Sequence, residues 1–350
     1  EKRTVQTILN DDASATVVFE FNLENTGNVN LSNISLTDNL SSAFTGSCVF
    51  EIQTFTSDNF NLNPAYNGNT VTEMLLPGNT LEVGTKKAVL LSVRVSACAP
   101  DATSFTNTAV ASGVSPGGVT VSDDDQSEVS LVESPLIGLA KQLVSIQNNA
   151  DGTYNALLNF RIRNYGDVII HNLELTDNLE DVFSPVDFEV LGISSEEFAV
   201  NTSFTGVPDV SDPEAINLLA SGNSLGVNQV GAVQLQIRIM ETGVYTNTSR
   251  VSGNTPRGTA VYDISHDGSD PAPGGGNNPD AFNDPTPIFA LECIPATAFA
   301  GPDAEICAGS AYQIVAAQAQ YYQHIEWTTS GDGSFDFDDI LRPVYTPGVN

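Results

Sequence analysis

The feature that most constrains the fold of this chain is a long internal repeat. The segment NTGNVNLSNISLTDNL at residues 25–40 returns as NYGDVIIHNLELTDNL at residues 164–179. Further along, FTNTAVASGVSPGG at residues 105–118 returns as YTNTSRVSGNTPRG at residues 245–258. A period of about 140 residues is too long for a solenoid unit and indicates a tandem array of domains.

The repeat divides the chain into three regions. We expect residues 1–134 to form one domain (copy 1) and residues 135–292 to form a second copy of it (copy 2), which ends in an acidic loop. Residues 293–350 have a different pattern and are few for a sandwich, so we expect a truncated third domain. Because the chain begins inside an expected strand and ends inside this third domain, we expect it to be a segment of a longer protein.

Short strands dominate the two copies. Segments such as ATVVFEFNLEN and YNALLNFRIRN alternate apolar and polar residues and are rich in Val, Ile, Leu and Phe. Gly and Asn separate these segments, as in YNGN and LPGN, and no long amphipathic helix is visible. These features predict an all-β chain of tandem β-sandwich domains.

Composition and motifs exclude several functions. The formal net charge is −31, so the chain offers no basic surface to nucleic acid. No apolar run is long enough to cross a membrane, and no signal peptide is visible. The histidines, His171, His266 and His324, lie in no catalytic motif, and Ser32 stands in copy 1 where copy 2 has His171. We therefore expect no enzymatic activity.

The four cysteines indicate disulfides and an oxidising compartment. Cys48 and Cys98 both belong to copy 1 and copy 2 lacks both, which favours a bond between them. Cys293 and Cys307 would then pair at the start of the third domain. No CxxC spacing supports zinc, and the alternative is four free buried thiols.

Two acidic runs suggest calcium sites at the domain junctions. One lies in a Gly/Pro/Asn-rich loop after residue 262, and the other lies near the end of copy 1. Ca²⁺ prefers six to eight hard oxygen ligands from flexible acidic loops. The ligands we expect are Asp263, Asp267, Asp270 and Asp284 in the first run, with Asp280 nearby, and Asp123 and Asp125 in the second. The alternative is that both runs are solvated linkers.

The repeated TDNL segment places Asp38 and Asp177 at equivalent positions. An aspartate at the end of a strand commonly accepts backbone N–H groups in a turn, so one interpretation is structural. A second interpretation assigns these carboxylates a chemical role, and it depends on a family resemblance.

NTGNVNLSNISLTDNL, with its downstream TNTA strand, resembles conserved repeat domains of large Bacteroidetes-type cell-surface and gliding-motility-associated adhesins. The third region, with AGPDAEICAG, WTTSGDGSF and YTPG, resembles the Ig-like or PKD-like repeats of the same proteins. The resemblance implies tandem Ig-like β-sandwich domains in an elongated array. It also implies secretion, often by the type IX route, and an extracellular location on the cell surface.

Many surface stalk proteins of sandwich type carry a Lys–Asn isopeptide cross-link promoted by a buried carboxylate. This chain has the required residue types in its first and last expected strands in both copies. The candidate sets are Lys2, Asp38 and Asn107 in copy 1, and Lys141, Asp177 and Asn247 in copy 2. A buried carboxylate has a raised pKa and can transfer the proton. The alternative is that each Lys protects a sheet edge and each Asn belongs to a turn.

The function we expect is structural. The chain would be a stalk segment of a secreted multidomain surface adhesin or filament that projects an adhesive tip. Its partners would be neighbouring repeats of the same long chain, with an extracellular polysaccharide or protein as a further ligand. The alternative is a binding module whose loops recognise such a polysaccharide or protein partner.

Overall fold

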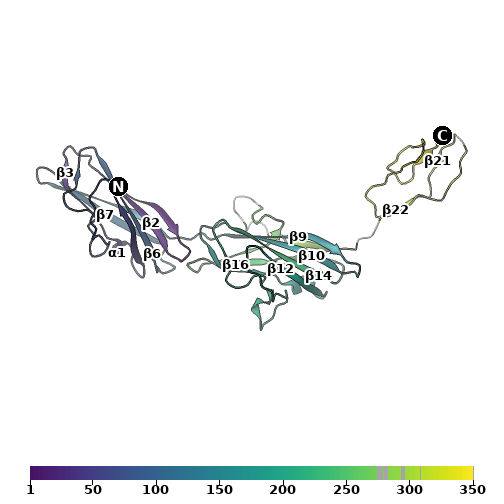
Figure 1. The fold of residues 1–350 in the computed structure, drawn as a ribbon, viewed down its shortest axis with the longest axis horizontal. Helices are drawn as coiled ribbons and strands as arrows, with labels where there is room; N and C mark the ends of the chain where they lie inside the picture. The colour runs from purple at the N-terminus through teal and green to yellow at the C-terminus, as the bar shows by residue number, and fades with distance from the viewer. Residues whose placement is uncertain (274–278, 280–282, 293–295, 308, 350) are drawn as a thin grey trace. The chain divides into compact units, whose positions relative to one another are not determined.

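The computed structural model describes residues 1–273, 279, 283–292, 296–307 and 309–349. The chain forms two compact units, Glu1–Ala290 and Leu291–Asn350. Nearly all regular structure is β-strand, which confirms the prediction of tandem Ig-like β-sandwich domains. The first unit contains two hydrophobic cores, one in each repeat copy; Figure 1 colours copy 1 purple to blue and copy 2 teal to green.

Copy 1 is a sandwich of two four-stranded sheets, with strand orders β1-β2-β6-β4 and β5-β3-β7-β8. Alternation along β2 buries one face of this strand, including Val17, Phe19 and Phe21, as the sequence pattern predicts. The strands are β1 (Lys2–Leu9), β2 (Ala15–Glu24), β3 (Leu31–Asp38), β4 (Val49–Thr56), β5 (Thr80–Leu81), β6 (Lys86–Ser96), β7 (Ser104–Val114) and β8 (Thr120–Ser130).

Copy 2 repeats this arrangement, with strand orders β12-β14-β10-β9-β18 and β13-β11-β16-β17 and a separate pair β15-β19. Its elements are β9 (Ile137–Asn148), β10 (Tyr154–Asn164), β11 (Ile170–Thr176), β12 (Phe188–Ser194), the 3₁₀ turn η1 (Pro213–Ile216), β13 (Ser224–Leu225), β14 (Val230–Ile239), β15 (Gly243–Asn247), β16 (Arg250–Asn254), β17 (Ala260–Ile264), β18 (His266–Asp267) and β19 (Thr286–Ala290).

The TDNL segments end a strand and begin a short helix. These helices are α1 (Leu40–Ala43) and α2 (Leu179–Phe183). Asn39 caps α1 by accepting the Ser42 backbone N–H, and Asn178 caps α2 in the same way. The asparagine of TDNL therefore satisfies the turn, which leaves the preceding aspartate available for another role.

An insertion interrupts the last strand of copy 2. In copy 1, β8 pairs with β7 along its whole length, and Ser127 lies opposite Asn107. In copy 2, Thr286 of β19 lies opposite Asn247, while β17 pairs only with β16. The strand is thus interrupted by an insertion between Ser265 and Thr286, and β18 near the start of the insertion pairs in parallel with β9. The prediction that the acidic run is a C-terminal loop at a domain junction is wrong, because the chain returns to the copy 2 sheet after it.

The Cys48–Cys98 disulfide is present, which confirms that prediction. It joins the residue before β4 to a residue just after β6, and these two strands are neighbours in one sheet. Cys307 is exposed and Cys293 lies outside the described residues, so the second pairing stays a prediction.

Within its described residues, the second unit contains five short strands: β20 (Thr297–Phe299), β21 (Tyr312–Gln313), β22 (Gln318–Gln320), β23 (Ser334–Phe335) and β24 (Val344–Thr346). Its tryptophan, Trp327, packs against Phe335 in a tilted arrangement, with 5.6 Å between ring centroids, and donates its indole N–H to the Ile340 carbonyl oxygen. Across the described residues of the whole chain, no helix is long and apolar enough to cross a membrane.

Candidate cross-linking sites

The structure brings together the lysine, aspartate and asparagine of copy 1 (the copy 1 triad). Lys2 Nζ lies 2.7 Å from Asp38 Oδ2, and Asn107 Nδ2 lies 3.1 Å from the same oxygen. The three side chains are buried, with at most 5 % of any of them exposed. One carboxylate oxygen therefore holds an amine and a carboxamide next to each other in the core.

Copy 2 repeats this geometry with Lys141, Asp177 and Asn247 (the copy 2 triad). Lys141 Nζ lies 2.7 Å from Asp177 Oδ2, and Asn247 Nδ2 lies 3.1 Å from that oxygen. Lys141 is fully buried. Gly268 of the insertion and Thr286 of β19 hold the backbone of this lysine, because the Gly268 N–H and the Thr286 hydroxyl both donate to its carbonyl oxygen.

Sheet topology explains why residues so distant in sequence meet. Lys2 begins β1 in one sheet, whereas Asp38 ends β3 and Asn107 lies on β7 in the other sheet. Inward-facing positions on the two sheets of a sandwich interdigitate, so these side chains meet between the layers. A bond between Lys and Asn would therefore join the two sheets covalently.

Burial shifts the pKa values of the two lysines and of Asp38 in the direction that formation of a Lys–Asn bond needs. Burial lowers the pKa of Lys2 and of Lys141, against the opposing effect of the nearby aspartate. Burial also raises the pKa of Asp38. Both directions favour a neutral amine beside a protonated carboxyl over a separated ion pair.

Both triads also contain buried oxygen atoms that lack a hydrogen-bond partner. Among the described residues, Asp38 Oδ1 and Asn107 Oδ1 are buried without a hydrogen-bond partner, as are Asp177 Oδ1 and Asn247 Oδ1. Buried polar atoms of this kind are normally satisfied. Each triad therefore contains one carboxyl oxygen and one amide oxygen that are unpaired in the core.

The expectation that Asp38 and Asp177 accept backbone N–H groups in a turn is wrong. Their side chains instead contact Lys Nζ and Asn Nδ2, and the neighbouring asparagines cap the turns. This outcome agrees with the alternative, chemical interpretation of the repeated segment.

Sequence reasoning missed two parts of these sites. Lys2 Nζ lies 5.0 Å from the ring centroids of Phe19 and Phe21, and Lys141 Nζ lies 5.0 Å from that of Phe160. The phenylalanine opposite each lysine recurs in both copies, and this recurrence is the signal that could have found it. Ser249 Oγ accepts from Lys141 Nζ at 2.9 Å and has no counterpart in copy 1, where Ala109 occupies the equivalent position.

The expected calcium ligands do not converge in the described residues. Asp263 is buried and accepts the Leu139 backbone N–H, whereas Asp267, Asp270 and Asp284 are exposed. Within the described ranges, no group of three or more His, Cys, Asp or Glu side chains is placed to hold a metal ion. Asp280 lies outside those ranges, and calcium binding stays a prediction.

The acidic run of copy 1 lies within β8 and not in a junction loop, so its expected location is wrong. Asp123 is exposed on this strand. Asp125 accepts the Lys2 backbone N–H at 2.7 Å, and this hydrogen bond lowers the pKa of the Asp125 carboxyl. Asp125 thus holds the first residue of the copy 1 triad in position.

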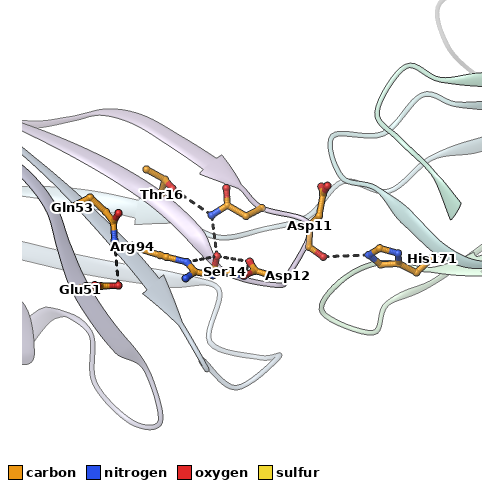
Figure 2. A network of polar contacts seen from close by, with 9 residues as sticks. Asp11, Asp12, Ser14, Thr16, Glu51, Gln53, Arg94 and His171 are labelled. Carbon is orange, nitrogen blue, oxygen red and sulfur yellow. Dashed lines mark hydrogen bonds and ion pairs between the residues drawn. The ribbon is translucent and has the colours of Figure 1, made fainter.

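The histidine of the repeat lies away from both triads. His171 Nε2 lies 3.2 Å from the backbone carbonyl oxygen of Asp11, in the turn between β1 and β2 (Figure 2). Beside this contact, Arg94 pairs with Asp12 and donates to Ser14 Oγ (Figure 2). None of these contacts involves a residue of either triad.

No protein-family model and no curated protein matches this chain. Among solved structures, domains D2 and D3 of the major pilin SpaD from Corynebacterium diphtheriae share 13% identity over 75% of this chain and 88% of that chain, with a TM-score of 0.27. The major pilin subunit BcpA of Bacillus cereus shares 12% identity over 81% of this chain and 62% of that chain, with a TM-score of 0.21. The C-terminal domain of the Streptococcus pyogenes antigen I/II-family protein AspA shares 8% identity over 76% of this chain and 98% of that chain, with a TM-score of 0.22.

These structural neighbours are pilin and adhesin domains of Gram-positive bacteria, and no match in sequence supports the resemblance to Bacteroidetes-type gliding adhesins. Their identities and TM-scores are too low to carry an argument. The class of this protein is therefore defined by its own geometry: it is an all-β protein with two tandem sandwiches, each with a buried Lys–Asp–Asn triad between its sheets.

Proposed function

We propose that this chain is a structural stalk segment of a bacterial cell-surface protein, and that Lys–Asn isopeptide bonds lock each of its sandwiches. The observation that supports this proposal is the recurrence of one buried triad, with the same contacts and distances, in both copies. The partners of such a segment would be neighbouring repeats of the same chain. We further propose that the parent protein is a secreted adhesin or filament of the Bacteroidetes surface type, with an adhesive tip in another part of that protein.

The proposed reaction is a transamidation that needs no cofactor. The neutral Lys Nζ attacks Cγ of the asparagine while the protonated aspartate donates to the amide oxygen and stabilises its developing charge. The Nζ–Cγ bond forms and the Cγ–Nδ2 bond breaks. Nδ2 leaves as ammonia with a proton taken from the attacking amine, and the aspartate returns to its starting state.

The contacts of the copy 2 triad support this proposal. Lys141 Nζ and Asn247 Nδ2 both contact Asp177 Oδ2, so nucleophile, leaving group and acid lie within hydrogen-bond reach of one atom. Burial lowers the pKa of the Lys141 amine, which favours its neutral form, and limits the access of water, which protects the amide from hydrolysis.

Intact mass after reduction of the disulfide tests this proposal. Each bond releases one ammonia, so the chain should weigh about 34 Da less than its sequence mass, and Asp177→Ala should restore about 17 Da of this difference. Asp181→Ala, at an exposed aspartate in the first turn of helix α2, should leave the deficit unchanged. Peptide mapping should find Lys141 joined to Asn247. The full sequence mass in the unmutated chain would reject the cross-links and leave the triads as buried polar contacts.

A further inference from the structure

Ser249 adds a hydroxyl group to the surroundings of the copy 2 triad. Its Oγ accepts a hydrogen bond from Lys141 Nζ at 2.9 Å, and the same nitrogen lies 2.7 Å from Asp177 Oδ2. Ser249 is 4 % exposed, so this contact lies in the core. A buried hydroxyl group is costly unless it is hydrogen-bonded, and here its partner is the amine that would form the cross-link.

Copy 1 has alanine at this position. Ala109 follows the triad asparagine of copy 1 by two residues, as Ser249 does in copy 2, and Ala109 is also buried. Within the described residues, the side chain of Lys2 donates a hydrogen bond to Asp38 and to no other group. The two copies therefore share the triad but differ in the number of acceptors around the lysine amine.

The register of the sheet places this position beside the triad aspartate. In copy 1, Ala109 on β7 lies directly opposite Asp38 on β3. In copy 2, the next pair along the strands, Thr176 with Arg250, keeps the same register. Directly opposite residues of an antiparallel pair have Cβ atoms about 4.5–5.5 Å apart. A serine at this position therefore lies close to the amine that the aspartate holds, in either copy.

Ser265 holds the backbone of Ser249. The Ser249 N–H donates to Ser265 Oγ at 2.9 Å, and the Ser265 N–H donates to the Ser249 carbonyl oxygen at 2.8 Å. Ser265 is fully buried and directly precedes β18. The residue at the Ser265 position in copy 1 is Asp125, which pairs with Ala109 in an uninterrupted strand. Because both of its backbone groups are bonded, Ser249 carries its hydroxyl group on a fixed stretch of chain.

Two acceptors fix the direction of an amine lone pair. A neutral lysine Nζ is tetrahedral and carries Cε, two N–H bonds and one lone pair. When one N–H donates to Asp177 Oδ2 and the other donates to Ser249 Oγ, rotation about Cε–Nζ is restrained and the lone pair stays available for attack. With a single acceptor, as at Lys2, the amine rotates about this bond more freely. Orientation of a nucleophile raises the rate of its reaction.

We propose that Ser249 is a fourth catalytic residue of copy 2, which orients the Lys141 amine for attack on Asn247. This inference rests on the proposed isopeptide bonds. As Nζ attacks, it gains positive charge, so its hydrogen bond to Ser249 Oγ becomes charge-assisted and strengthens in the transition state. Ser249 keeps its own proton, and the proton lost by the amine leaves with Nδ2 as ammonia. The hydroxyl group therefore accelerates the reaction without being consumed.

Refolding of the full chain tests this role. The chain and its variants are recovered unfolded from inclusion bodies in denaturant, where the triads are not assembled, and dilution starts folding. Samples are quenched in acid and digested, and mass spectrometry follows the Lys141–Asn247 and Lys2–Asn107 bonds separately. Ser249→Ala should slow formation of the Lys141–Asn247 bond by about tenfold or more and leave the Lys2–Asn107 bond unchanged. Ser249→Thr, which keeps the hydroxyl group, should restore the rate to within about threefold of the starting chain.

The reciprocal variant in copy 1 provides an independent test. Ala109→Ser should speed formation of the Lys2–Asn107 bond by about threefold or more, because its hydroxyl group would lie beside Asp38. Pulsed hydrogen exchange of β10 amides during the same refolding measures how fast copy 2 folds. If Ser249→Ala also slows folding, the Ala109→Ser result decides, and an unchanged copy 1 rate would reject the proposal.

The outcomes separate this inference from the proposed cross-links. If both bonds form and Ser249→Ala leaves the rate of the Lys141–Asn247 bond unchanged, the role of Ser249 is rejected and the cross-links stand. If neither bond forms in the folded starting chain, the cross-links are rejected, and the role of Ser249 is rejected with them. Slower bonding in Ser249→Ala at an unchanged folding rate, with recovery in Ser249→Thr, supports the proposal.

Discussion

Removal of the Asp177 carboxylate should destabilise copy 2 strongly. In Asp177→Ala, the fully buried Lys141 amine keeps Ser249 Oγ as a hydrogen-bond partner but loses its carboxylate. Breaking a buried ion pair by removing one partner costs about 3–5 kcal/mol. Because burial already lowers the pKa of Lys141, part of this penalty is avoided by deprotonation, and we expect about 3 kcal/mol.

A double-mutant cycle separates this ion pair from the proposed covalent bond. The cycle is built in an Asn247→Ala background, where no isopeptide bond can form. Lys141→Met and Asp177→Ala should each be costly, because each leaves a buried polar group without its partner. The double variant should cost less than the sum of the single variants by about 2 kcal/mol or more.

Hydrogen exchange of β9 and β10 amides under increasing denaturant is the suitable assay, because it reports on copy 2 apart from copy 1. Asp181→Ala, at an exposed aspartate, is the matched control and should change stability by less than about 0.5 kcal/mol. Additivity of the two single variants within about 0.5 kcal/mol would refute the reasoning. A cost of Asp177→Ala below about 1 kcal/mol would refute it as well.

Four further predictions address other parts of the molecule. Burial raises the pKa of Asp38, so the stability that its protonated form contributes is complete below the ordinary aspartate pKa of about 3.9 and is lost as pH rises through the folded-state pKa. Asp38→Asn should remove this pH dependence of the unfolding free energy, measured by denaturation between about pH 3 and about pH 8. Parallel pH profiles of the variant and the starting chain would contradict this prediction. Replacing Cys48 and Cys98 by Ser should lower the unfolding free energy of copy 1 by about 4 kcal/mol in the chain-entropy model, measured by denaturant titration, with copy 2 unchanged. Gly166→Ala should destabilise copy 2 by about 1–3 kcal/mol because its Cβ would meet backbone atoms, whereas Gly27→Ala, which meets only a side-chain oxygen at 3.2 Å, should have a smaller effect in the same thermal unfolding assay. If the acidic insertion binds calcium, millimolar Ca²⁺ should raise the melting temperature of the chain by mass action, and equal melting curves with Ca²⁺ and with chelator would reject that site.

Several features were predictable because they repeat. The alternation in β2 and β10 identified strands that face a core, and the recurrence of lysine, aspartate and asparagine at equivalent positions identified both triads. Equivalent positions in two diverged copies carry information that a single copy lacks, because unconstrained positions have changed. The disulfide followed from the same comparison, since both cysteines are present in one copy and both are absent from the other.

Features set by long-range pairing were not predictable. The acidic insertion has the Gly, Pro and Asn content of a linker, and only the pairing of Thr286 with Asn247 shows that it interrupts a strand. The role of Asp38 was misread because local turn chemistry was applied to a side chain whose partners are far away in sequence. The helices that follow TDNL span four and five residues, which is too short for a 3.6-residue periodicity to appear.

The disulfide of copy 1 lies inside the loop that a Lys2–Asn107 bond would close, so it limits extension under force only where the proposed cross-links are absent, as in a chain with Asn107→Ala and Asn247→Ala. The bonded cysteines are separated by 50 residues, and the chain between them cannot contribute to extension while the bond is intact. At about 3.4 Å per extended residue, roughly 170 Å of contour length stays hidden. Copy 2 has no equivalent cysteines, so the two sandwiches should give steps of different length when they unfold under force. A reducing agent should lengthen only the copy 1 step, and this difference would show which of the two sandwiches gives way first.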